Sequence, residues 1–565
     1  MSFEELKAGA LAAWQDFNGG DRPRILIGTA SCGRAAGALE VLEQFKGELV
    51  RQKLKADIMQ VGCLGLCYAE PLVAIRKPGK ATVFYAGVTP AMAATLVRDC
   101  IKGNKPHPEL ALGTLGEPGI KDIPALFDLD VFKLQKRLLL KNCGLIDPLD
   151  ISHYIASGGY AGLCKTLGMK PADVIAEVKA SGLRGRGGAG FPTGLKWEFC
   201  CNAPGAQKYF ICNADEGDPG TFVDRTLMES DPHSVLEGLI IGGYAVGASM
   251  GYIYIRDEYP LAAQTMQKAV DAAQEAGLLG DGILGSGFSF RVEIRRGAGA
   301  FVCGEETALI NSIEGKCGLP RVRPPFPARK GLWDQPTNVN NVETLANIPF
   351  IMQNGGQWYA SIGFKKSTGT KLFSLSGTLQ RPGVVEVPFG ITLGQLIAGP
   401  GGGLPEGKKL KALQPGGAML GLMPAGFAGT PIDFETLAEI GSGVGSGGMV
   451  AIDESACMVD TARLLMKFCD EESCGKCMPG YLGVSQMLAI LNDITHAKGQ
   501  TNDPELLAEL GDSMIKGTLC PLCGGAPNPV LSTLKHYAAE YEAHIQEHRC
   551  PAGVCRMATE AGSIG

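Results

Sequence analysis

Residues 184–196 read R-G-R-G-G-A-G-F-P-T-G-L-K, and residues 213–220 read N-A-D-E-G-D-P-G. The first stretch places glycines where the backbone can close on a phosphate, and an aromatic residue and a lysine follow. The second stretch is an acidic turn that can accept hydrogen bonds from a sugar or a ring N–H. Together the two stretches indicate a site for an anionic, ring-bearing cofactor.

The glycine run formally contains G-x-G-x-x-G, starting at Gly185. It follows a predicted helix over Pro171–Gly182, whereas a dinucleotide fingerprint follows a strand. The standard dinucleotide turn is therefore disfavoured. A phosphate-cradling loop and a tight turn that simply needs glycine both remain open.

Outside these two stretches, the expected pattern of secondary structure changes several times along the chain. Residues 208–352 alternate strands and helices, which favours an α/β domain with parallel strands, including buried strands at 209–212 and 251–255. The other segments are a β-α-β-β-β-α pattern over 24–100, a Pro- and Gly-rich linker over 102–122, short strands over 371–426 and helices over 457–548.

The length, net charge and cysteine content of the chain exclude several classes of protein. A chain of 565 residues is too long for one core, so three or four domains are expected. The net charge of −6 argues against a nucleic-acid partner. The sequence contains neither an eighteen-residue apolar run nor a secretory leader. Nineteen cysteines in such a chain favour reduced thiols and a cytoplasmic location.

Three further motifs identify a family. They are F-V-C-G-E-E-T at 301–307, R-P-P-F-P-A at 323–328 and N-V-N-N-V-E-T at 338–344. With the opening stretches, these segments resemble the NADH-binding flavoprotein subunit of respiratory complex I over residues 140–540. The same resemblance extends to the soluble diaphorase subunits of bifurcating hydrogenases, NAD-linked formate dehydrogenases and class II benzoyl-CoA reductase complexes.

The resemblance implies a multidomain α/β fold. The expected parts are a thioredoxin-like module, a Rossmann-like domain for FMN and NADH, a ubiquitin-like β-rich (SLBB-type) domain and a C-terminal helix bundle with an iron–sulfur cluster. Their expected bounds are 1–102 for the module, 103–140 for a linker, 141–365, 366–440 and 441–545 for the three domains, and 546–565 for a cysteine-containing tail.

The resemblance also implies which residues bind the flavin and the nucleotide. Residues expected around FMN are Gly185, Gly187, Gly188, Gly190, Lys196, Asn213, Asp215, Glu216, Gly304, Glu305, Asn340, Asn341 and Thr344. NADH would lie on the flavin, in contact with Phe191, Phe199, Asp218, Glu306 and Phe326. For the three phenylalanines, ordinary core packing is the alternative.

Two residues depart from the family pattern within this site. The family usually has Glu where this chain has Asp218, and Tyr where it has Phe301. An acid at position 218 would face the adenosine ribose and repel a 2′-phosphate, which favours NADH over NADPH. No catalytic acid is expected, because hydride passes directly between the two cofactors.

The cysteine motif E-S-C-G-K-C at 472–477 matches the family's cluster motif, except that its third cysteine is replaced by Gly480. Cys523 stands where relatives carry glycine. We therefore expect a relocated ligand set for a [4Fe–4S] cluster at Cys474, Cys477, Cys520 and Cys523. Zinc at these four thiolates, or no metal, is the alternative.

Two other cysteine groups lie near the ends of the chain. The C-terminal segment resembles the junction before a ferredoxin domain, and a C₃H zinc site is a weaker prediction, from Cys469, His544, His548, Cys550 and Cys555. The N-terminal module offers three ligands for a [2Fe–2S] cluster, Cys32, Cys63 and Cys67. The family's fourth ligand falls near Ile27, which cannot bind iron, so loss of this cluster is favoured over retention.

The leading hypothesis is an electron-input subunit that exchanges hydride between NADH and FMN and passes single electrons to the cluster around Cys474. The expected partners are a thioredoxin-like [2Fe–2S] subunit and a larger iron–sulfur subunit. A non-conducting scaffold and a zinc-stabilised flavoprotein limited to two-electron transfer are the alternatives. The final acceptor is not encoded in recognisable motifs.

Overall fold

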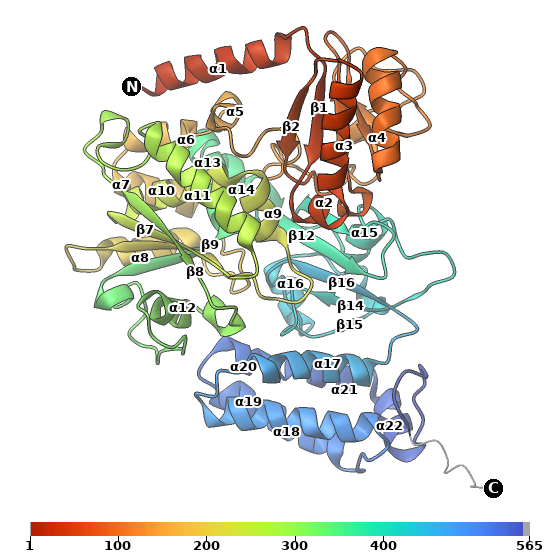
Figure 1. Cartoon of the computed structure of the whole chain (residues 1–565). Coiled ribbons are helices and arrows are strands. Elements are labelled where there is room, and N and C mark those ends of the chain that lie inside the picture. Colours follow the sequence, from red (N-terminus) through yellow and green to blue (C-terminus); the bar gives the residue numbers. More distant parts are fainter. Residues whose placement is uncertain (1, 558–565) are drawn as a thin grey trace.

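The computed structural model describes residues 2–557, which form three larger sheets followed by a C-terminal helical bundle (Figure 1). The chain is therefore a multidomain α/β protein, as predicted. Helix α1 (Phe3–Gly19) precedes the first sheet and packs on α5 (Ile151–Ala156). The C-terminal bundle lies at the opposite end of the molecule from α1.

The N-terminal sheet has the strand order β2-β1-β3-β4-β5, with β1 and β2 parallel and the other pairs antiparallel. The four predicted strands are present. The predicted linker over 102–122 is wrong in part, because it contributes the edge strand β5. The strands are β1 (Arg24–Gly28), β2 (Asp57–Val61), β3 (Val73–Arg76), β4 (Thr82–Tyr85) and β5 (Ala111–Leu115), and the helices are α2 (Ser31–Ala35), α3 (Ala38–Arg51) and α4 (Pro90–Leu96).

The central sheet has the order β8-β7-β6-β9, and all of its strands are parallel, as the alternating pattern predicts. Its strands are β6 (Tyr209–Ala214), β7 (Met250–Ile255), β8 (Arg291–Arg296) and β9 (Thr337–Asn341). The helices before and around it are α6 (Ala161–Leu167), α7 (Pro171–Ala180), α8 (Thr193–Asn202), α9 (Val223–Ser230), α10 (Pro232–Val246), α11 (Pro260–Glu275), α12 (Glu306–Ile313), α13 (Val342–Asn354) and α14 (Gly356–Ala360).

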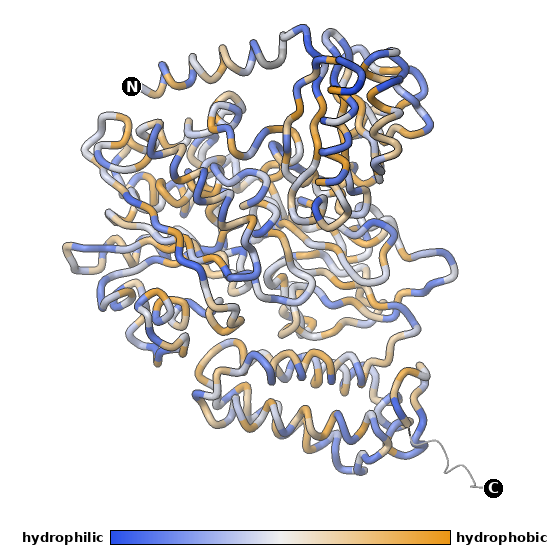
Figure 2. The backbone as a smooth tube through the Cα atoms, in the orientation of Figure 1, coloured by the Kyte–Doolittle hydropathy of each residue, from blue (hydrophilic) through white to orange (hydrophobic). Residues whose placement is uncertain are grey.

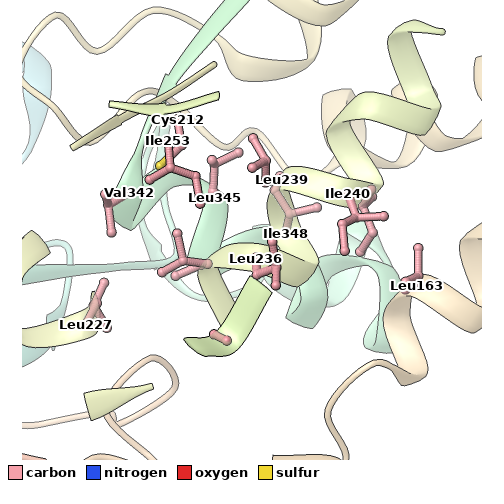
Figure 3. Close-up of a cluster of buried hydrophobic side chains, with 14 of the residues drawn as sticks. Leu163, Cys212, Leu227, Leu236, Leu239, Ile240, Ile253, Val342, Leu345 and Ile348 are labelled. Atoms are coloured by element: carbon pink, nitrogen blue, oxygen red, sulfur yellow. The ribbon is translucent and has the colours of Figure 1, made fainter. Parts of the chain in front are cut away.

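Helices α10 and α13 pack against one face of this sheet and form the largest core of the protein (Figure 3). Alternate residues of β6 point to opposite faces: Phe210 and Cys212 join the core with α10, whereas Ile211 joins a second cluster with α12. A parallel sheet covered on both faces needs apolar residues throughout its strands. This explains why β6 reads as a continuous apolar run that ends in a polar turn.

The third sheet has the order β13-β12-β16-β14-β15. Its central strand β16 (Gly448–Asp453) lies beyond residue 440, so the predicted boundary between the β-rich domain and the helical domain is too early. The remaining elements are the hairpin β10 (Gly363–Phe364) and β11 (Ser367–Thr368), then β12 (Thr370–Gly377), β13 (Gly383–Pro388), β14 (Leu410–Pro415), β15 (Met423–Pro424), α15 (Leu393–Ala398) and α16 (Phe434–Glu439).

The C-terminal segment is helical, as predicted. It contains α17 (Met458–Glu471), α18 (Met478–Thr495), α19 (Asp503–Gly517), α20 (Pro521–Gly525), α21 (Asn528–His536) and α22 (Ala538–Gln546). Hydrophobic residues lie mainly along the buried strands and on the inner faces of helices (Figure 2). Among residues 2–557, no helix combines the length and apolar character needed to cross a membrane.

Candidate flavin, nucleotide and cluster site

The glycine-rich loop connects α7 to α8 and closes against the junction of β9 and α13. Gly188 and Gly190 have φ of +121° and +62°, a region that side chains disfavour. A Cβ at Gly187 would lie 2.9 Å from the Cβ of Asn341, and one at Gly190 would lie 2.7 Å from the Phe434 ring. Part of the glycine pattern is therefore required by close packing of the loop itself.

The start of α8, directly after this loop, offers free hydrogen-bond donors. No side chain caps this helix, and although the Thr193 N–H donates to the Leu183 carbonyl at 2.9 Å, the N–H groups of Gly194 and Leu195 have no partner among the described residues. Within residues 2–557, the buried hydroxyl of Thr193 also finds no partner. Free N–H groups and a hydroxyl at a helix start fit the phosphate of a nucleotide. The sequence reasoning missed Thr193, although its place just after the glycine run was a usable signal.

The acidic turn after β6 carries an unsatisfied buried carboxyl group. Asn213 donates from Nδ2 to the carbonyl of Gly304 at 2.8 Å and accepts the backbone N–H of Asp215 at 3.1 Å. In the described part of the chain, Oδ2 of Asp215 is buried without a partner. Burial raises the pKa of Asp215 to about 7. A buried acceptor of this kind fits a ligand that donates a hydrogen bond.

Two other predicted flavin residues serve as helix caps. The Glu216 carboxylate accepts the backbone N–H groups of Asp224 and Arg225 at 2.9 and 3.1 Å, at the start of α9. Glu305 caps α12, accepting the N–H groups of Thr307 and Ala308, both at 2.9 Å. Both carboxylates therefore shape the site by fixing helices beside it.

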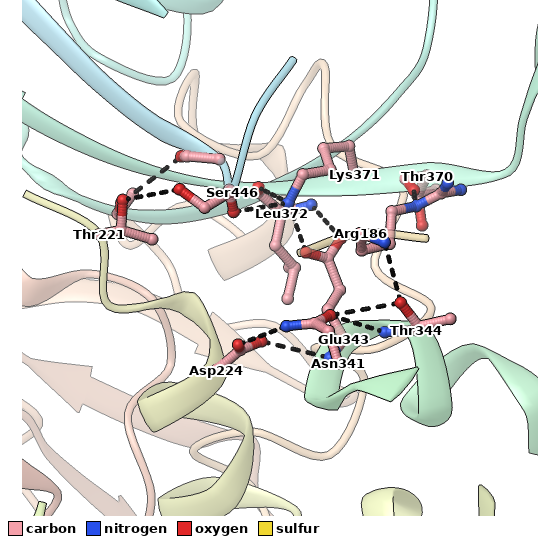
Figure 4. Close-up of polar contacts among 12 residues, drawn as sticks. Arg186, Thr221, Asp224, Asn341, Glu343, Thr344, Thr370, Lys371, Leu372 and Ser446 are labelled. Carbon is pink, nitrogen blue, oxygen red and sulfur yellow. Dashed lines mark hydrogen bonds and ion pairs between the residues drawn. The ribbon is translucent and has the colours of Figure 1, made fainter. Parts of the chain in front are cut away.

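Asn341, at the end of β9, is fixed in the same way, as the cap of α13 (Figure 4). Asn341 accepts the Thr344 N–H at 3.1 Å and donates to Asp224 at 2.5 Å. The Thr344 hydroxyl accepts the backbone N–H of Arg186, in the glycine loop, at 2.8 Å. Asn340 accepts the indole N–H of Trp197 at 2.8 Å. The loop, α8 and β9 thus form one hydrogen-bonded frame.

Lys196 and Glu306 form an ion pair at 2.7 Å, and Arg323 approaches Glu306 at 3.5 Å. Burial acts to raise the pKa of Glu306, but the two cations outweigh it and hold the pKa below its ordinary value. Glu306 is therefore anionic at neutral pH. Lys196, predicted to bind the flavin, is already neutralised by a side chain predicted to lie near the nicotinamide, so the two predicted positions adjoin.

The three phenylalanines predicted to contact NADH are exposed. The exposed fractions are 45% for Phe191, 49% for Phe199 and 57% for Phe326, so core packing is wrong as an explanation for all three. Asp218 lies elsewhere, against the third sheet: its Oδ2 accepts the Ser446 hydroxyl at 2.5 Å. Its Oδ1 is buried and has no partner among the described residues.

The four predicted cluster cysteines lie where the helical bundle meets the central domain, although among the described residues no three of their sulfur atoms lie within 4.8 Å of one another. Burial and the nearby thiols of Cys520 and Cys477 raise the pKa of Cys474. The hydrogen bond from Cys523 lowers the pKa of Cys520 to about 6. A Cβ at Gly480 would lie 2.9 Å from the sulfur atoms of both Cys477 and Cys523. The Cys523 thiol therefore occupies the space into which a side chain at position 480 would point.

Phe301 connects this cysteine group to the acidic turn. A Cβ at Gly217 would lie 2.2 Å from the Phe301 ring, and the same ring packs against a hydrophobic cluster formed by Cys520, Leu522 and Cys523. The ring also lies 5.2 Å from that of Phe468 in α17, measured between centroids. One aromatic side chain thus spans the distance between the candidate flavin pocket and the candidate cluster.

Comparisons with known proteins agree with this geometry. Residues 178–350 match the Nuo51 FMN-binding domain, and residues 460–544 match the NADH-ubiquinone oxidoreductase-F iron–sulfur binding region. The NADP-reducing hydrogenase subunit HndC of Solidesulfovibrio fructosivorans is 52% identical over 75% of this chain and 86% of its own length. The chain belongs to the family of NADH oxidoreductase flavoprotein subunits.

Further relatives extend the comparison. An NADH-quinone oxidoreductase subunit of Rhizobium meliloti is 49% identical over 73% of this chain and 99% of its own. A crystal structure of an NAD+-reducing [NiFe]-hydrogenase in the H2-reduced state aligns with a TM-score of 0.65 and 28% identity. That alignment covers 97% of this chain and 91% of the other. The resemblance noted from the motifs is confirmed, and this family member carries the FMN-binding and [4Fe–4S]-binding regions.

The C-terminal metal group of this family member differs from the prediction. Cys457, His544, Cys550 and Cys555 place one ligand atom each within 4.8 Å of all the others. His544 and Cys555 were predicted correctly as neighbours, together with Cys550. Cys469 is wrong, because its sulfur is not among the ligand atoms that lie within 4.8 Å of one another, and His548 is wrong, because it is exposed and also outside this group.

Cys457 was missed, since 87 residues separate it from His544 and no local motif joins them. The Nε2 atom of His544 lies 3.5 Å from the Cys457 sulfur and 3.3 Å from the Cys555 sulfur. Its Nδ1 lies 2.6 Å from the Glu540 carbonyl, which leaves Nε2 free as a ligand atom. The hydrogen bond from Cys555 lowers the pKa of Cys457 to about 4.

The N-terminal cysteines also come together. The sulfur atoms of Cys32, Cys63 and Cys67 all lie within 4.8 Å of one another, and those of Cys63 and Cys67 are 3.8 Å apart. Ile27 is fully buried in the core of the module, so it contributes no ligand. The structure thus assembles the three predicted thiols without a fourth.

Proposed function

We propose that this chain is the electron-input subunit of a larger oxidoreductase complex, with NADH and FMN bound at the glycine loop and electrons leaving through the Cys474 centre. The observation that carries the proposal is the Phe301 ring, which packs against both the acidic turn and the cluster of Cys520, Leu522 and Cys523. When bound, FMN supplies the conversion of a two-electron hydride donor into single-electron output.

The chain's own groups fit FMN in three ways. The uncapped start of α8 and the free Thr193 hydroxyl suit its phosphate. The unpartnered oxygen of Asp215 suits a hydroxyl or ring N–H. The helix caps made by Glu216, Glu305 and Asn341 hold the pocket walls, so we assign these three residues to positioning and Asp215 and Thr193 to contact.

For the nucleotide, we propose that Phe191, Phe199 and Phe326 stack on the adenine and that Glu306 orients the nicotinamide side. The exposure of these three rings leaves their faces available for stacking on a base. Asp218 supports NADH over NADPH, because its unpartnered oxygen can accept a ribose hydroxyl and repels a phosphate. The scaffold alternative is disfavoured, because it leaves the buried oxygens of Asp215 and Asp218 without a role.

At the cluster, we propose Cys474, Cys477, Cys520 and Cys523 as ligands of the [4Fe–4S] centre. The contact between position 480 and the Cys523 sulfur supports replacement of the family's third cysteine in space. For Cys457, His544, Cys550 and Cys555 we propose zinc. Bonds of about 2.0–2.3 Å to a tetrahedral ion place ligand atoms roughly 3.4–3.8 Å apart. The ligand atoms of Cys457, His544 and Cys555 are separated by 3.3–3.6 Å, and that of Cys550 lies within 4.8 Å of all three.

We also propose an identity for each domain and for the partner subunits. We interpret the N-terminal sheet as a thioredoxin-like module, the central domain as Rossmann-like and the third sheet as a ubiquitin-like module. The proposed partners are a thioredoxin-like [2Fe–2S] subunit and a larger iron–sulfur subunit. The cysteine content supports a cytoplasmic location.

Anaerobic rapid mixing of the holoprotein with NADH tests the proposal through loss of flavin absorbance. Phe326→Ala should weaken NADH binding by about 10–100-fold, because stacking on a base contributes roughly 1–3 kcal/mol. Phe127→Ala is the matched control, since Phe127 is also exposed but lies outside the proposed pocket. Equal effects of the two substitutions would contradict the assignment of the nucleotide site.

A further inference from the structure

The three thiols of the N-terminal module form one compact group. The sulfur atoms of Cys32, Cys63 and Cys67 all lie within 4.8 Å of one another, and those of Cys63 and Cys67 are 3.8 Å apart. A [2Fe–2S] cluster takes four protein ligands, two on each iron. No sulfur of this group is set apart for a second iron, so its geometry fits a single metal ion.

The strand β1 supplies no fourth ligand for an iron cluster. Ile27 is fully buried in the apolar core of the module, and the next residue, Gly28, faces the opposite side of the strand, toward the Glu70 carboxylate. Oε1 of Glu70 lies 3.6 Å from the sulfur of Cys32, but Glu70 is not part of the 4.8 Å group. Glu70 is therefore a neighbour of the thiol group and not one of its ligands.

The two segments that carry the thiols are both fixed to helix α9. Ser31, directly before Cys32, donates from its backbone N–H and its hydroxyl to the Glu229 carboxylate at 2.8 and 2.6 Å. The backbone N–H of Cys63 donates to the Ser230 hydroxyl at 2.9 Å. Glu229 and Ser230 are the last two residues of α9. The protein frame therefore holds the three sulfur atoms together before any metal binds.

The loop between Cys63 and Cys67 also provides groups that favour thiolates. The backbone N–H of Gly65 donates to the Cys63 sulfur at 3.3 Å. A Cβ at Gly65 would lie 3.8 Å from Nη1 of Arg137, and this buried nitrogen has no hydrogen-bond partner within residues 2–557. An N–H donor and a nearby guanidinium both favour a thiolate over a thiol. Three thiolates around a divalent ion leave one excess negative charge, which Arg137 offsets.

We propose that Cys32, Cys63 and Cys67 bind one zinc ion, in place of the family's [2Fe–2S] cluster. Zinc accepts thiolate ligands, and Zn–S bonds of about 2.3 Å in a tetrahedral site place two sulfur atoms about 3.8 Å apart, as observed for Cys63 and Cys67. A zinc site with three protein ligands keeps its fourth position for water, and the partly exposed Cys32 and Cys67 let solvent reach it. Because zinc has no redox chemistry, the N-terminal module carries no electrons.

The test uses the full chain, purified anaerobically, with metal analysis and EPR spectra after reduction by dithionite. Wild type should show bound zinc and no [2Fe–2S] signal. Cys67→Ser should lose about one zinc ion per chain, because two thiolates remain of the three that hold it. Cys100→Ser is the matched control and should lose no zinc, since Cys100 is a buried cysteine of the same module that lies outside the group.

Alkylation of the wild-type chain decides the question even if Cys67→Ser disturbs folding. Cys32 and Cys67 should resist iodoacetamide in the metal-loaded protein and react after a chelator removes zinc, as read by peptide mass spectrometry. Equal alkylation in both states would overturn the proposal, as would unchanged zinc content in Cys67→Ser, or a [2Fe–2S] signal or copper that is lost in that variant. Bound FMN and the reduced [4Fe–4S] signal should persist in both variants, which separates failure here from failure of the proposed function.

Discussion

At the scale of single residues, the most informative groups are buried oxygens that no other described residue satisfies. Asp215 and Asp218 each leave one carboxylate oxygen without a partner, and Thr193 leaves its hydroxyl. An unpaired buried polar atom costs about 1–3 kcal/mol, so these three atoms, which come from the two stretches predicted to bind the cofactors, favour a bound polar ligand. The sequence motifs located the two acids, but only packing reveals which oxygen remains free.

The raised pKa of Asp215 predicts a pH dependence of FMN binding. Its pKa is about 7 without ligand, above the ordinary value of 3.8, because the side chain is buried. A flavin group that donates a hydrogen bond favours the ionised acid, so FMN affinity should rise as pH increases from 6 to 8. The loss below pH 7 should approach about tenfold per unit. FMN binding to the FMN-free Asp215→Asn variant should be measured at each pH. The part of the pH dependence that is due to Asp215 should then be absent, and only the part due to ionisation of the FMN phosphate should remain.

The contact between Gly480 and Cys523 predicts that the cluster ligand can be moved from position 523 to position 480, where the family has its third cysteine. Cys523→Ser should lose the [4Fe–4S] signal while FMN remains bound. The double variant Gly480→Cys with Cys523→Gly should regain it, because the new side chain enters the volume that the Cys523 sulfur leaves. Iron analysis and low-temperature EPR check both. An unchanged cluster in Cys523→Ser would contradict the relocation.

At the scale of elements, the site is built from helix starts. The predicted flavin residues Glu216, Glu305 and Asn341 cap α9, α12 and α13, so their identities are explained by capping as much as by ligand binding. Periodicity and turn residues predicted β1 to β4 of the N-terminal sheet, β6 and β7 of the central sheet, and short strands without individual bounds in the third. The sequence patterns assigned β5 to a linker and β16 to a segment outside the third sheet. Neither the pairing of an edge strand, such as β5 with β4, nor the pairing of strands far apart in the chain, such as β16 with β12, leaves a local signal in the sequence.

The C-terminal metal group also depends on a contact between distant residues that the sequence patterns did not predict. The tail motif predicted Cys550 and Cys555, but their partner Cys457 caps a helix far away in the chain. If zinc joins these residues, Cys555→Ser or chelation should lower the melting temperature of the helical bundle. A loss of about 2 kcal/mol corresponds to roughly 8–16 °C in a domain of this size. Calorimetry checks this. His548→Ala, in the same tail but outside the group, should have no effect.

At the scale of the whole molecule, the order of cofactor sites follows from how the domains meet. The acidic turn, Phe301 and the cluster cysteines lie in contact, although they come from segments 80 to 300 residues apart in the chain. Motif order could predict which groups are present. Only the packing of the helical bundle against the central domain brings the acidic turn, Phe301 and the cysteines next to one another. This contact distinguishes a protein that conducts electrons from a flavoprotein that carries an unconnected metal.

The most direct test of this arrangement is an EPR spectrum of the anaerobically purified chain after addition of NADH, together with its flavin and metal content. The account predicts bound FMN, at least about four irons and a reduced [4Fe–4S] signal that develops with NADH alone and disappears in Cys474→Ser. Flavin that is reduced by NADH while the cluster signal stays absent, or zinc in place of iron at these four cysteines, would contradict it.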